Sequence, residues 1–301
     1  MRKLVGWIRA LRPQQWTKNG LVFAALIFAH QFRDSAQVER AVAAFVLFCA
    51  LASSVYLVND LCDLEEDRRH PKKCRRPLAA GLISPLTGVI TAVLLGVGGL
   101  AGFFLLNAAS GWIAVTYLVL QLAYNLRLKQ VVIVDVLCVS AGFVIRAAIG
   151  ATAINVVISP WLLICTILLA LFLALSKRRQ ELQTHGAEAA NHRRILEEYS
   201  PYLLDQMIAV VTASTLMSYA LYTISDRTVR ELGTDKLMYT IPFVIYGIFR
   251  YLYLVHKKDE GEAPDRVLLT DAPLLIDALL YGVAVVVILI FFARPGGPFA
   301  F

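Results

Sequence analysis

Long runs of apolar residues alternate with short polar segments along almost the whole chain. A helix that crosses a bilayer needs about 20 predominantly apolar residues, and nine stretches approach or reach that length. They are too long and alternate too little to be strands of a membrane barrel, so we expect helices. The predicted spans cover residues 20–32 (a short one), 41–58, 84–106, 109–126, 131–152, 158–176, 206–225, 236–255 and 272–292.

The composition agrees with a membrane protein, because 58% of the 301 residues are hydrophobic and only 17% are charged. No separate soluble domain fits between the spans, so we predict one all-α, membrane-embedded domain over residues 1–301. Within residues 1–19, Leu4, Trp7, Ile8 and Leu11 recur at helical spacing among basic side chains. This pattern is typical of an interfacial helix and not of a signal peptide.

The positive charges gather on one side of the predicted membrane. If the N-terminus is cytoplasmic, 22 of the 29 Lys and Arg residues fall on the cytoplasmic side. The positive-inside rule therefore predicts a multi-pass protein of the plasma (inner) membrane, with a cytoplasmic N-terminus and an outside C-terminus. The net charge of +7 then reflects topology, and we expect no nucleic-acid partner. Five cysteines show no pairing pattern, so no disulfide is predicted.

The strongest chemical signal lies at the end of the second predicted span, in Asn59, Asp60, Asp63 and Asp67. At about 100° per residue, the three carboxylates share one helical face. Hard oxygen ligands of this kind suit Mg²⁺, so we predict that Asp60, Asp63 and Asp67 bind the metal. The alternative is a solvated acidic helix end, although carboxylates crowded at the end of a span are costly unless something neutralises them.

Basic residues follow directly, between positions 68 and 77, and of these we expect Arg76 to contact a phosphate group. The positive-inside rule alone would also account for most of the basic residues in this loop. Before the first span, Trp16 would anchor at the interface, and Lys18 could face the same cavity as the acidic cluster. Basic residues also follow the sixth span, where Lys177, Arg178 and Arg179 are adjacent. Snorkelling of these three side chains at the membrane edge is the alternative to a role in substrate binding.

A further constellation comprises Tyr124, Arg127, Lys129 and Asp135, around the turn between the fourth and fifth spans. Asp135 interrupts an apolar run, where a carboxylate normally has a partner or a function. Arg146 follows eleven residues later on nearly the same helical face. Structural pairs between helices are the alternative explanation of these residues. All of these polar clusters lie at one mouth of the predicted bundle, whereas a transporter would place pathway residues at mid-membrane and on both sides.

The segments NDLCDLEEDRRHP, RRPLAAG and YNLRLK resemble the UbiA superfamily of membrane-embedded transferases, in motif order and along nearly the whole chain. The resemblance implies a nine-helix bundle with a cytoplasm-facing cavity. It also implies that Asn59, Asp60, Asp63 and Asp67 hold a diphosphate-bearing donor through Mg²⁺. Prenyltransferases of the superfamily carry a second acidic motif after the sixth helix. Here SKRRQEL stands in that place, and its basic groups suit phosphate oxygens instead.

Together with LRPQQWTKN and KRRQEL, these motifs are similar to the decaprenyl-phosphate phosphoribosyltransferase branch, which serves cell-wall arabinan synthesis. The resemblance implies 5-phosphoribosyl diphosphate as donor and a polyprenyl phosphate as acceptor. An aromatic or quinone prenyltransferase and a lipid transporter are the alternatives, and the oligomeric state is left open, a homo-oligomer included. We predict catalytic roles for Asp60, Asp63, Lys129 and Asp135, and substrate contacts from Lys18, Asn59, Arg76, Tyr124, Arg127, Arg146, Lys177, Arg178 and Arg179.

Overall fold

The computed structural model describes residues 2–29, 31–71, 73–158, 160–185, 194–257 and 270–292. Throughout these ranges all regular structure is helical and no strand is present. The chain divides into two compact units, the first formed by residues 1–129 and 141–159 and the second by 130–140 and 160–301. Helix α7 (Val134–Ala153) gives its first turns to the second unit and the remainder to the first.

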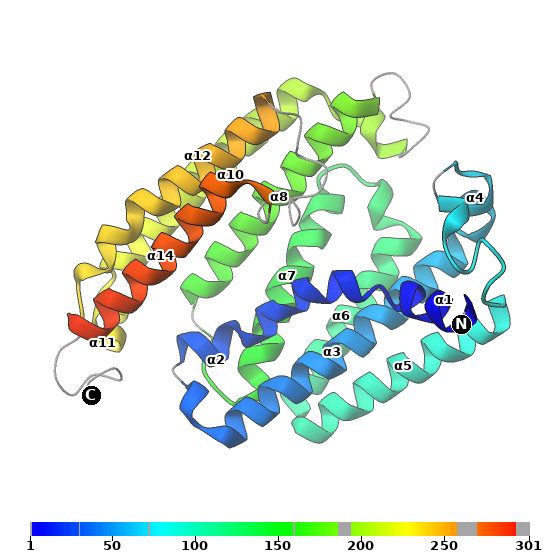
Figure 1. Cartoon of the computed structure of the whole chain (residues 1–301), viewed down its shortest axis with the longest axis horizontal. Coiled ribbons are helices and arrows are strands. Elements are labelled where there is room, and N and C mark those ends of the chain that lie inside the picture. Colours follow the sequence, from blue (N-terminus) through cyan, green and yellow to red (C-terminus); the bar gives the residue numbers. More distant parts are fainter. Residues whose placement is uncertain are drawn as a thin grey trace. The chain divides into compact units, whose positions relative to one another are not determined.

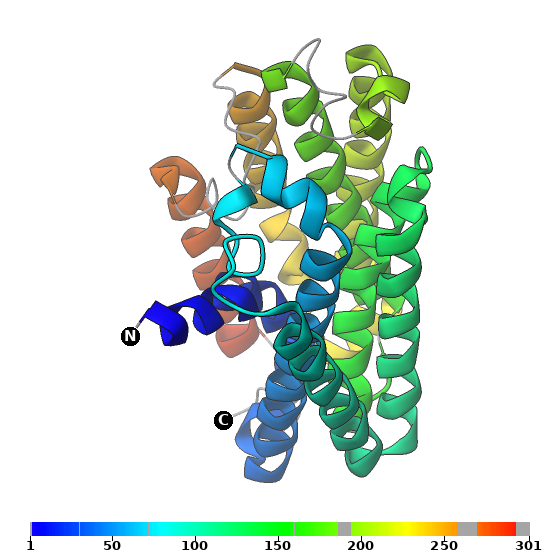
Figure 2. The same cartoon turned by 90° about the vertical axis from the view of Figure 1, so that its right-hand side faces the viewer.

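The first unit is built around α3 (Ser35–Cys62), which packs along α5 and also contacts α6 (Figures 1 and 2). Its core holds Phe48, Leu51, Phe103 and Tyr117, all buried. The remaining elements are α1 (Arg2–Leu11), the 3-10 helix η1 (Pro13–Phe23), α2 (Ala24–Phe28), η2 (Gln31–Arg33), α4 (Leu64–Arg69), η3 (Lys73–Arg75), α5 (Pro85–Leu106), α6 (Ala108–Leu126) and η4 (Leu128–Gln130).

Small residues bring α3 and α5 close together. A Cβ atom added at Gly99 would lie 2.8 Å from Cδ2 of Leu51, and one at Gly96 would lie 3.0 Å from Oγ of Ser54. The Ser54 hydroxyl donates to the carbonyl of Ala92 at 2.7 Å. Between membrane helices, glycine permits such close backbone approach, and van der Waals contact and hydrogen bonds across the interface then stabilise the pair.

The second unit is organised around α8 (Pro160–His185) and α10 (Pro201–Ile224), which pack against each other. Buried apolar side chains from several helices meet in its core, among them Phe172, Leu204 and Leu254. The other elements are η6 (Arg194–Glu198), α11 (Asp226–Leu232), η7 (Lys236–Thr240), α12 (Ile241–Lys257) and α14 (Ala272–Phe291).

Local sequence signals fix where several helices begin. Oγ of Ser84 accepts a hydrogen bond from the backbone N–H of Thr87 at the start of α5. The carboxylate of Asp271 does the same for Leu274 at the start of α14. Each cap satisfies an N–H group that the helix itself cannot pair. A proline follows in the first turn of both helices, where its missing N–H is harmless.

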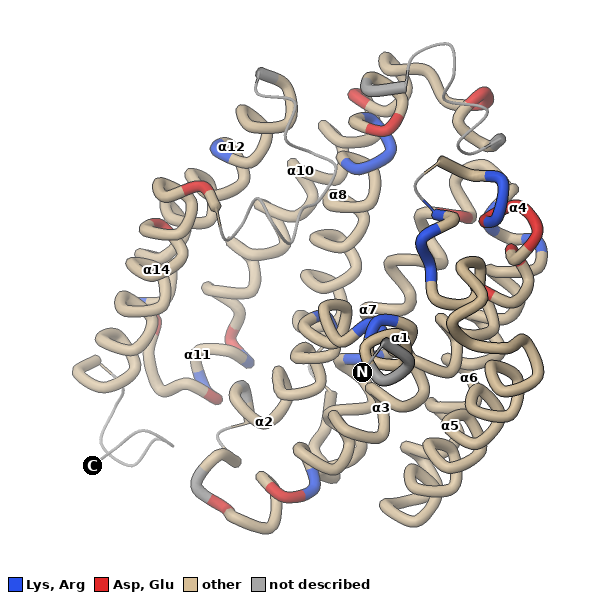
Figure 3. The backbone as a smooth tube through the Cα atoms, turned by 45° about the vertical axis from the view of Figure 1, so that its right-hand side comes forward, with Lys and Arg blue, Asp and Glu red and all other residues tan. Residues whose placement is uncertain are grey.

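Seven helical segments in the described ranges are long and apolar enough to cross a membrane, which agrees with seven of the predicted spans. Their outward faces are apolar, as at Leu105, which is 88% exposed. Such faces suit a hydrocarbon solvent. Figure 3 shows α5 and α6 without charged residues, whereas charges gather around α4. The seven segments are Ser35–Cys62, Pro85–Leu106, Val134–Ala153, Pro160–Gln183, Pro201–Ile224, Lys236–His256 and Ala272–Phe291.

The two other predicted spans are not among these seven, so the count of nine stays a prediction. Residues 20–32 are divided between η1, α2 and η2 and do not form one continuous helix. Residues 109–126 do form a helix, α6, but it carries Gln121 and Asn125 among its apolar residues. The N-terminal helix expected over 1–19 ends at Leu11, because Arg12 takes a left-handed φ of 53° and Pro13 begins η1.

Candidate active site

The three carboxylates that we predicted to bind the metal lie where α3 passes into α4. Asp60 is in the last turn of α3, Asp63 caps that helix, and Asp67 is in α4. The N–H groups of Asp63 and Asp67 donate to carbonyls four residues earlier, at 3.0 and 2.8 Å, so the backbone keeps a nearly helical course through the junction. Asp60 and Asp67 are 2% and 1% exposed. Buried carboxylates at this density require partners of opposite charge.

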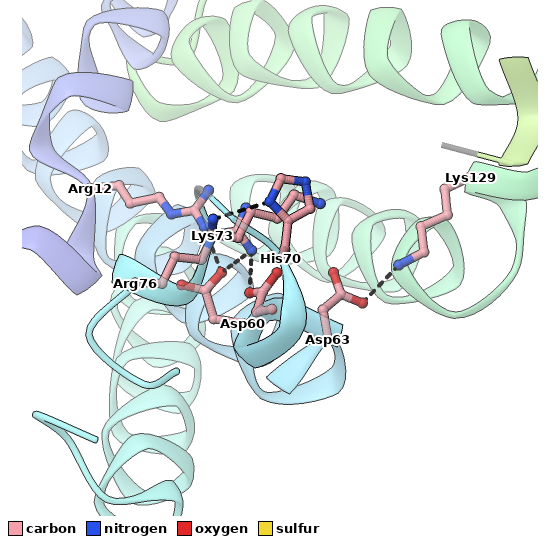
Figure 4. A network of polar contacts seen from close by, with 8 residues as sticks. Arg12, Asp60, Asp63, His70, Lys73, Arg76 and Lys129 are labelled. Atoms are coloured by element: carbon pink, nitrogen blue, oxygen red, sulfur yellow. Dashed lines mark hydrogen bonds and ion pairs between the residues drawn. The ribbon is translucent and has the colours of Figure 1, made fainter. Parts of the chain in front are cut away.

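Two arginines supply that charge (Figure 4). Nη2 of Arg12 donates to Oδ1 of Asp60 at 2.5 Å. Nη1 of Arg76 donates to the same oxygen at 3.1 Å and to Oδ2 of Asp67 at 2.6 Å. The guanidinium of Arg12 also stands 4.8 Å from the centroid of the Tyr56 ring. The predicted contact residue Arg76 therefore belongs to this cluster, and Arg12 joins it from the turn between α1 and η1.

Asp63 points elsewhere, toward Lys129 (Figure 4). Nζ of Lys129, in η4 after α6, contacts Oδ1 of Asp63 at 3.1 Å. Both side chains are about one quarter exposed. The structure thus brings together two residues for which we predicted catalytic roles, and it separates the Asp63 carboxylate from the pair that Arg76 bridges.

The carboxylates fit a magnesium ion in number and chemistry. Among the described residues no group of three His, Cys, Asp or Glu side chains is arranged to hold a metal. Mg²⁺, however, usually takes only one or two carboxylates and completes its octahedron with water and substrate phosphate. Asp60 and Asp67 both contact Nη1 of Arg76. The two carboxylates therefore converge on one place, which the Arg76 guanidinium occupies.

Arg146 occupies a second polar site within the first unit. Its Nε donates to Oδ1 of Asn19 at 3.0 Å, and its Nη1 donates to the carbonyl of Gly142 at 2.7 Å. The guanidinium lies 5.2 to 5.6 Å from the ring centroids of Phe48, Tyr117 and Phe143. A buried cation so placed gains from the aromatic faces. Gly150 allows this arrangement, since a Cβ there would collide with the carbonyl of Val22 in η1.

The other predicted contact residues of the first unit surround these sites less closely. Lys18 belongs to η1 and Asn59 to the last turn of α3, and both side chains are partly exposed. Tyr124 lies in the last turn of α6 and is partly buried, whereas Arg127 follows that helix and is exposed. Their roles stay predictions.

In the second unit, Asp135 is fully buried at the start of α7 and pairs with Arg178 of α8. Nε of Arg178 donates to Oδ2 of Asp135 at 2.9 Å, and its Nη1 donates to Oε2 of Glu181 at 2.6 Å. The hydroxyl of Tyr199 donates to Oδ1 of Asp135 at 2.7 Å. Burial is the main reason, and the bond to Asp135 the next, that the pKa of Tyr199 rises to about 12.

The rest of the basic run is paired as well. Nε of Arg179 contacts Oδ1 of Asp205 on α10, and its Nη1 donates to Oε1 of Gln183 at 2.7 Å. His256 of α12 stands 3.3 Å from the same Asp205 oxygen. Lys177 is 46% exposed and reaches Glu181 only at 3.9 Å. Of the three predicted phosphate ligands, two guanidinium groups therefore lie buried on carboxylates and the ammonium group lies near the surface.

Sequence reasoning missed Arg12, Tyr199 and Asp205. Nothing local to Arg12 distinguishes it from the other basic residues of the N-terminal segment, because its partner Asp60 lies 48 positions later. Tyr199 and Asp205 are likewise separated from Asp135 and Arg179 by 64 and 26 positions. A buried charge implies a partner, but the sequence does not identify it.

Comparison with known proteins agrees with this fold. Residues 20–272 match the UbiA prenyltransferase family, and the chain belongs to that family. A UbiA homologue from Archaeoglobus fulgidus, whose structure is bound to DMAPP and Mg²⁺, superposes with a TM-score of 0.71 at 19% identity. That alignment covers 93% of this chain and 98% of the other. A structure of digeranylgeranylglyceryl phosphate synthase gives 0.65 at 14% identity over 99% of both chains.

Several relatives with higher identity are decaprenyl-phosphate phosphoribosyltransferases. The protein of that name from Corynebacterium glutamicum is 36% identical over 92% of this chain and 84% of its own length. The Mycolicibacterium smegmatis protein is 36% identical, with 90% and 88% covered. The Mycobacterium tuberculosis protein is 34% identical, with 92% of each chain covered.

Proposed function

We propose that the chain transfers the 5-phosphoribosyl group of 5-phosphoribosyl diphosphate to a polyprenyl phosphate and releases diphosphate. The observation that carries the proposal is the similarity to decaprenyl-phosphate phosphoribosyltransferases, at 34% to 36% identity over 90% to 92% of this chain. The site supports it, because the donor bears phosphate at both ends. An acidic cluster suits a metal-bound diphosphate, while separate basic groups suit the remaining phosphates. Use of the product for cell-wall arabinan stays a prediction.

The acidic cluster is the proposed place of the diphosphate. Asp60 and Asp67 would hold Mg²⁺, with Asp63 beside them, and the bound metal would neutralise the departing diphosphate. Arg12 and Arg76 now contact the carboxylates that the metal would take. These guanidinium groups then become available to diphosphate oxygens, for which their bidentate geometry is well suited. Lys129, on Asp63, is a further cation for the same role.

In the transfer itself, the bond between C1 of the ribose and the diphosphate oxygen breaks, and its electron pair leaves with the diphosphate. Positive charge develops at C1, as in glycoside chemistry. An oxygen of the lipid phosphate donates the electron pair of the new bond from the opposite face, which inverts the anomeric centre. A phosphate monoester is largely anionic near neutral pH, so no strong general base is required. The residues of the chain then act through position and charge.

We assign the 5-phosphate of the donor and the phosphate of the lipid to basic side chains. Arg178, Arg179 and Lys177 follow the apolar part of α8, in the position where prenyltransferases of the family carry acidic residues, and they would bind phosphate oxygens directly. Lys18, Asn59, Tyr124, Arg127 and Arg146 are proposed as further substrate contacts. The cytoplasmic side is the proposed location of all these groups, in a multi-pass protein of the plasma membrane with its C-terminus outside.

A direct assay tests this proposal. Purified protein in detergent is incubated with labelled 5-phosphoribosyl diphosphate and decaprenyl phosphate, with Mg²⁺ or with EDTA. We expect a labelled lipid and stoichiometric diphosphate with Mg²⁺, and neither with EDTA. A second reaction offers geranyl diphosphate and an aromatic acid, because the Archaeoglobus fulgidus homologue binds DMAPP. Prenyl transfer in that reaction, without phosphoribosyl transfer in the first, would make the chain an aromatic prenyltransferase.

A further inference from the structure

The hydroxyl of Tyr199 joins two groups at the start of α7. It accepts a hydrogen bond from the backbone N–H of Ile133 at 2.8 Å and donates to Oδ1 of Asp135 at 2.7 Å. Tyr199 is 4% exposed and Asp135 is 0% exposed, so neither bond competes with bulk solvent. Both bonds lie within the second unit: Tyr199 directly follows η6, Ile133 precedes α7 and Asp135 lies in its first turn.

That turn has an unusual backbone. Ile133 has a φ of +68°, and the N–H of Val134 donates to the carbonyl of Val132 at 2.8 Å across it. A hydrogen bond between residues two apart around a positive φ defines the γ-turn of the rare, strained kind. A β-branched residue is especially unfavourable there. Strain of this sort persists only where the surroundings hold it, and it is concentrated at functional sites.

The turn leads directly into Asp135, whose carboxylate contacts Arg178. Oδ2 of Asp135 accepts from Nε of Arg178, while Glu181 accepts from Nη1 of the same guanidinium. A continuous series of hydrogen bonds therefore leads from the Ile133 backbone, through the Tyr199 hydroxyl and the Asp135 carboxylate, to the Arg178 guanidinium. A guanidinium held in one orientation in this way is positioned to contact phosphate oxygens.

We propose that Tyr199 is a positioning residue for phosphate binding: its hydroxyl holds the strained Ile133 turn and the Asp135 carboxylate, and thereby orients Arg178 toward a phosphorylated substrate. This inference rests on the proposed function, which places a phosphate at Arg178. The pKa of Tyr199, raised to about 12, keeps the hydroxyl protonated as a donor at every working pH.

Tyr199→Phe tests the inference, because it removes the hydroxyl and keeps the buried ring. We expect the KM of one phosphorylated substrate to rise about tenfold, the effect of losing a hydrogen bond to a charged group, while kcat changes much less. Tyr202→Phe is the matched control, since Tyr202 is 74% exposed in the next helix, and it should leave both constants unchanged. Thermal unfolding of both variants would show that each is folded.

A second substitution separates positioning from general stability. In the Tyr199→Phe protein, Ile133→Gly should lower the raised KM again, because glycine adopts a positive φ without steric cost. Amide hydrogen exchange gives a readout that needs no substrate: the N–H of residue 133 should exchange faster in Tyr199→Phe than in the wild-type protein.

The outcomes distinguish the inference from the proposed function. Unchanged KM values in a folded, active Tyr199→Phe protein would overturn the positioning role and leave the proposed function intact. An equal fall in kcat with every substrate, not relieved by Ile133→Gly, would also overturn it. If the wild-type protein transfers no phosphoribosyl group although residue 133 is protected, the proposed function fails and the inference falls with it.

Discussion

Asp60 and Asp67 share one nitrogen atom of Arg76, at 3.1 and 2.6 Å. Both carboxylates are buried, and Asp60 has Arg12 as a second partner. Breaking a buried ion pair by removing one member costs about 3–5 kcal/mol, because the remaining charge is left uncompensated. The two carboxylates therefore behave as one unit whose total charge must match the cations around it, whether these are guanidinium groups or a metal.

Asp60→Asn and Asp67→Asn should each reduce turnover at least about a hundredfold, because the proposed metal loses an anionic ligand. The Mg²⁺ concentration that gives half-maximal activity should rise in both variants if activity is measurable. Steady-state kinetics over a Mg²⁺ series gives the result. Asp63→Asn should also lower turnover, but through the loss of its contact with Lys129.

Glu65→Gln is the matched control, since Glu65 is exposed on the same short helix and pairs only weakly with Arg68 across one turn. It should retain near-normal kinetics. Near-normal kinetics in folded Asp60→Asn and Asp67→Asn proteins as well would remove the basis for the metal assignment.

Arg12→Gln should lower kcat/KM for the diphosphate donor about tenfold to a hundredfold. The guanidinium of Arg12 lies on Asp60 and would pass to the diphosphate, and contacts between ionised groups of this kind are strong. Arg9→Gln, three residues earlier on an exposed position of α1, serves as the control for charge in this segment. Equal effects of the two substitutions would point to membrane association and not to the site.

The sequence predicted the apolar helices well, because a bilayer imposes one simple requirement of length and polarity on every span. It also placed Asp60, Asp63 and Asp67 at one helix end, but it did not show that Asp63 points toward Lys129 while Asp60 and Asp67 share Arg76. The interfacial helix predicted over residues 1–19 ends early, at Leu11, because Arg12 takes a left-handed φ, which composition does not reveal.

Contacts between residues that are far apart in the chain were the other feature that the sequence did not predict. The sequence indicated that Asp135 needed a partner or a function, but not that its partner is Arg178, with Tyr199 as a third member. Likewise Lys129 was placed beside Asp135 by proximity in the chain, whereas its ammonium group contacts Asp63. Pairs of this kind depend on how helices pack, and helical periodicity within one segment carries no information about that.

Arg178→Gln and Arg179→Gln should raise the KM of a phosphorylated substrate about tenfold or more, if these groups bind phosphate. Arg227→Gln provides the comparison, because Arg227 pairs with Glu231 on the exposed surface of α11. Restoring charge with Arg178→Lys should recover less than half of the loss, since an ammonium group cannot replace the two donors directed at Asp135 and Glu181. Kinetics that stay normal while membrane insertion declines would identify the run as a topological anchor.

Reporter fusions test the proposed topology. A reporter that is active only in the cytoplasm should give signal at the N-terminus and none at the C-terminus, because with the nine predicted spans 22 of the 29 basic residues fall on the cytoplasmic side. A third fusion, in the loop after Leu106, should be inactive. Cytoplasmic signal from both ends would mean an even number of spans, and residues 20–32 would be the first candidate to lie in the interface and not across the bilayer.

Gly150→Ala should disturb the site from a distance. A methyl group at this position would collide with the carbonyl of Val22, a backbone atom that no rotamer change can move away. The η1 segment must then shift, and with it Asn19, whose side chain accepts from Arg146. Overpacking of this kind costs about 1–3 kcal/mol, so the melting temperature in detergent should fall by several degrees.

Gly98→Ala is the matched control, because a Cβ at Gly98 has no neighbour within 4 Å, and alanine there should be neutral or slightly stabilising. If Arg146 takes part in substrate binding, Gly150→Ala should also raise a KM at temperatures where the protein is fully folded. A lowered melting temperature with unchanged kinetics would confine the Arg146 site to a structural role.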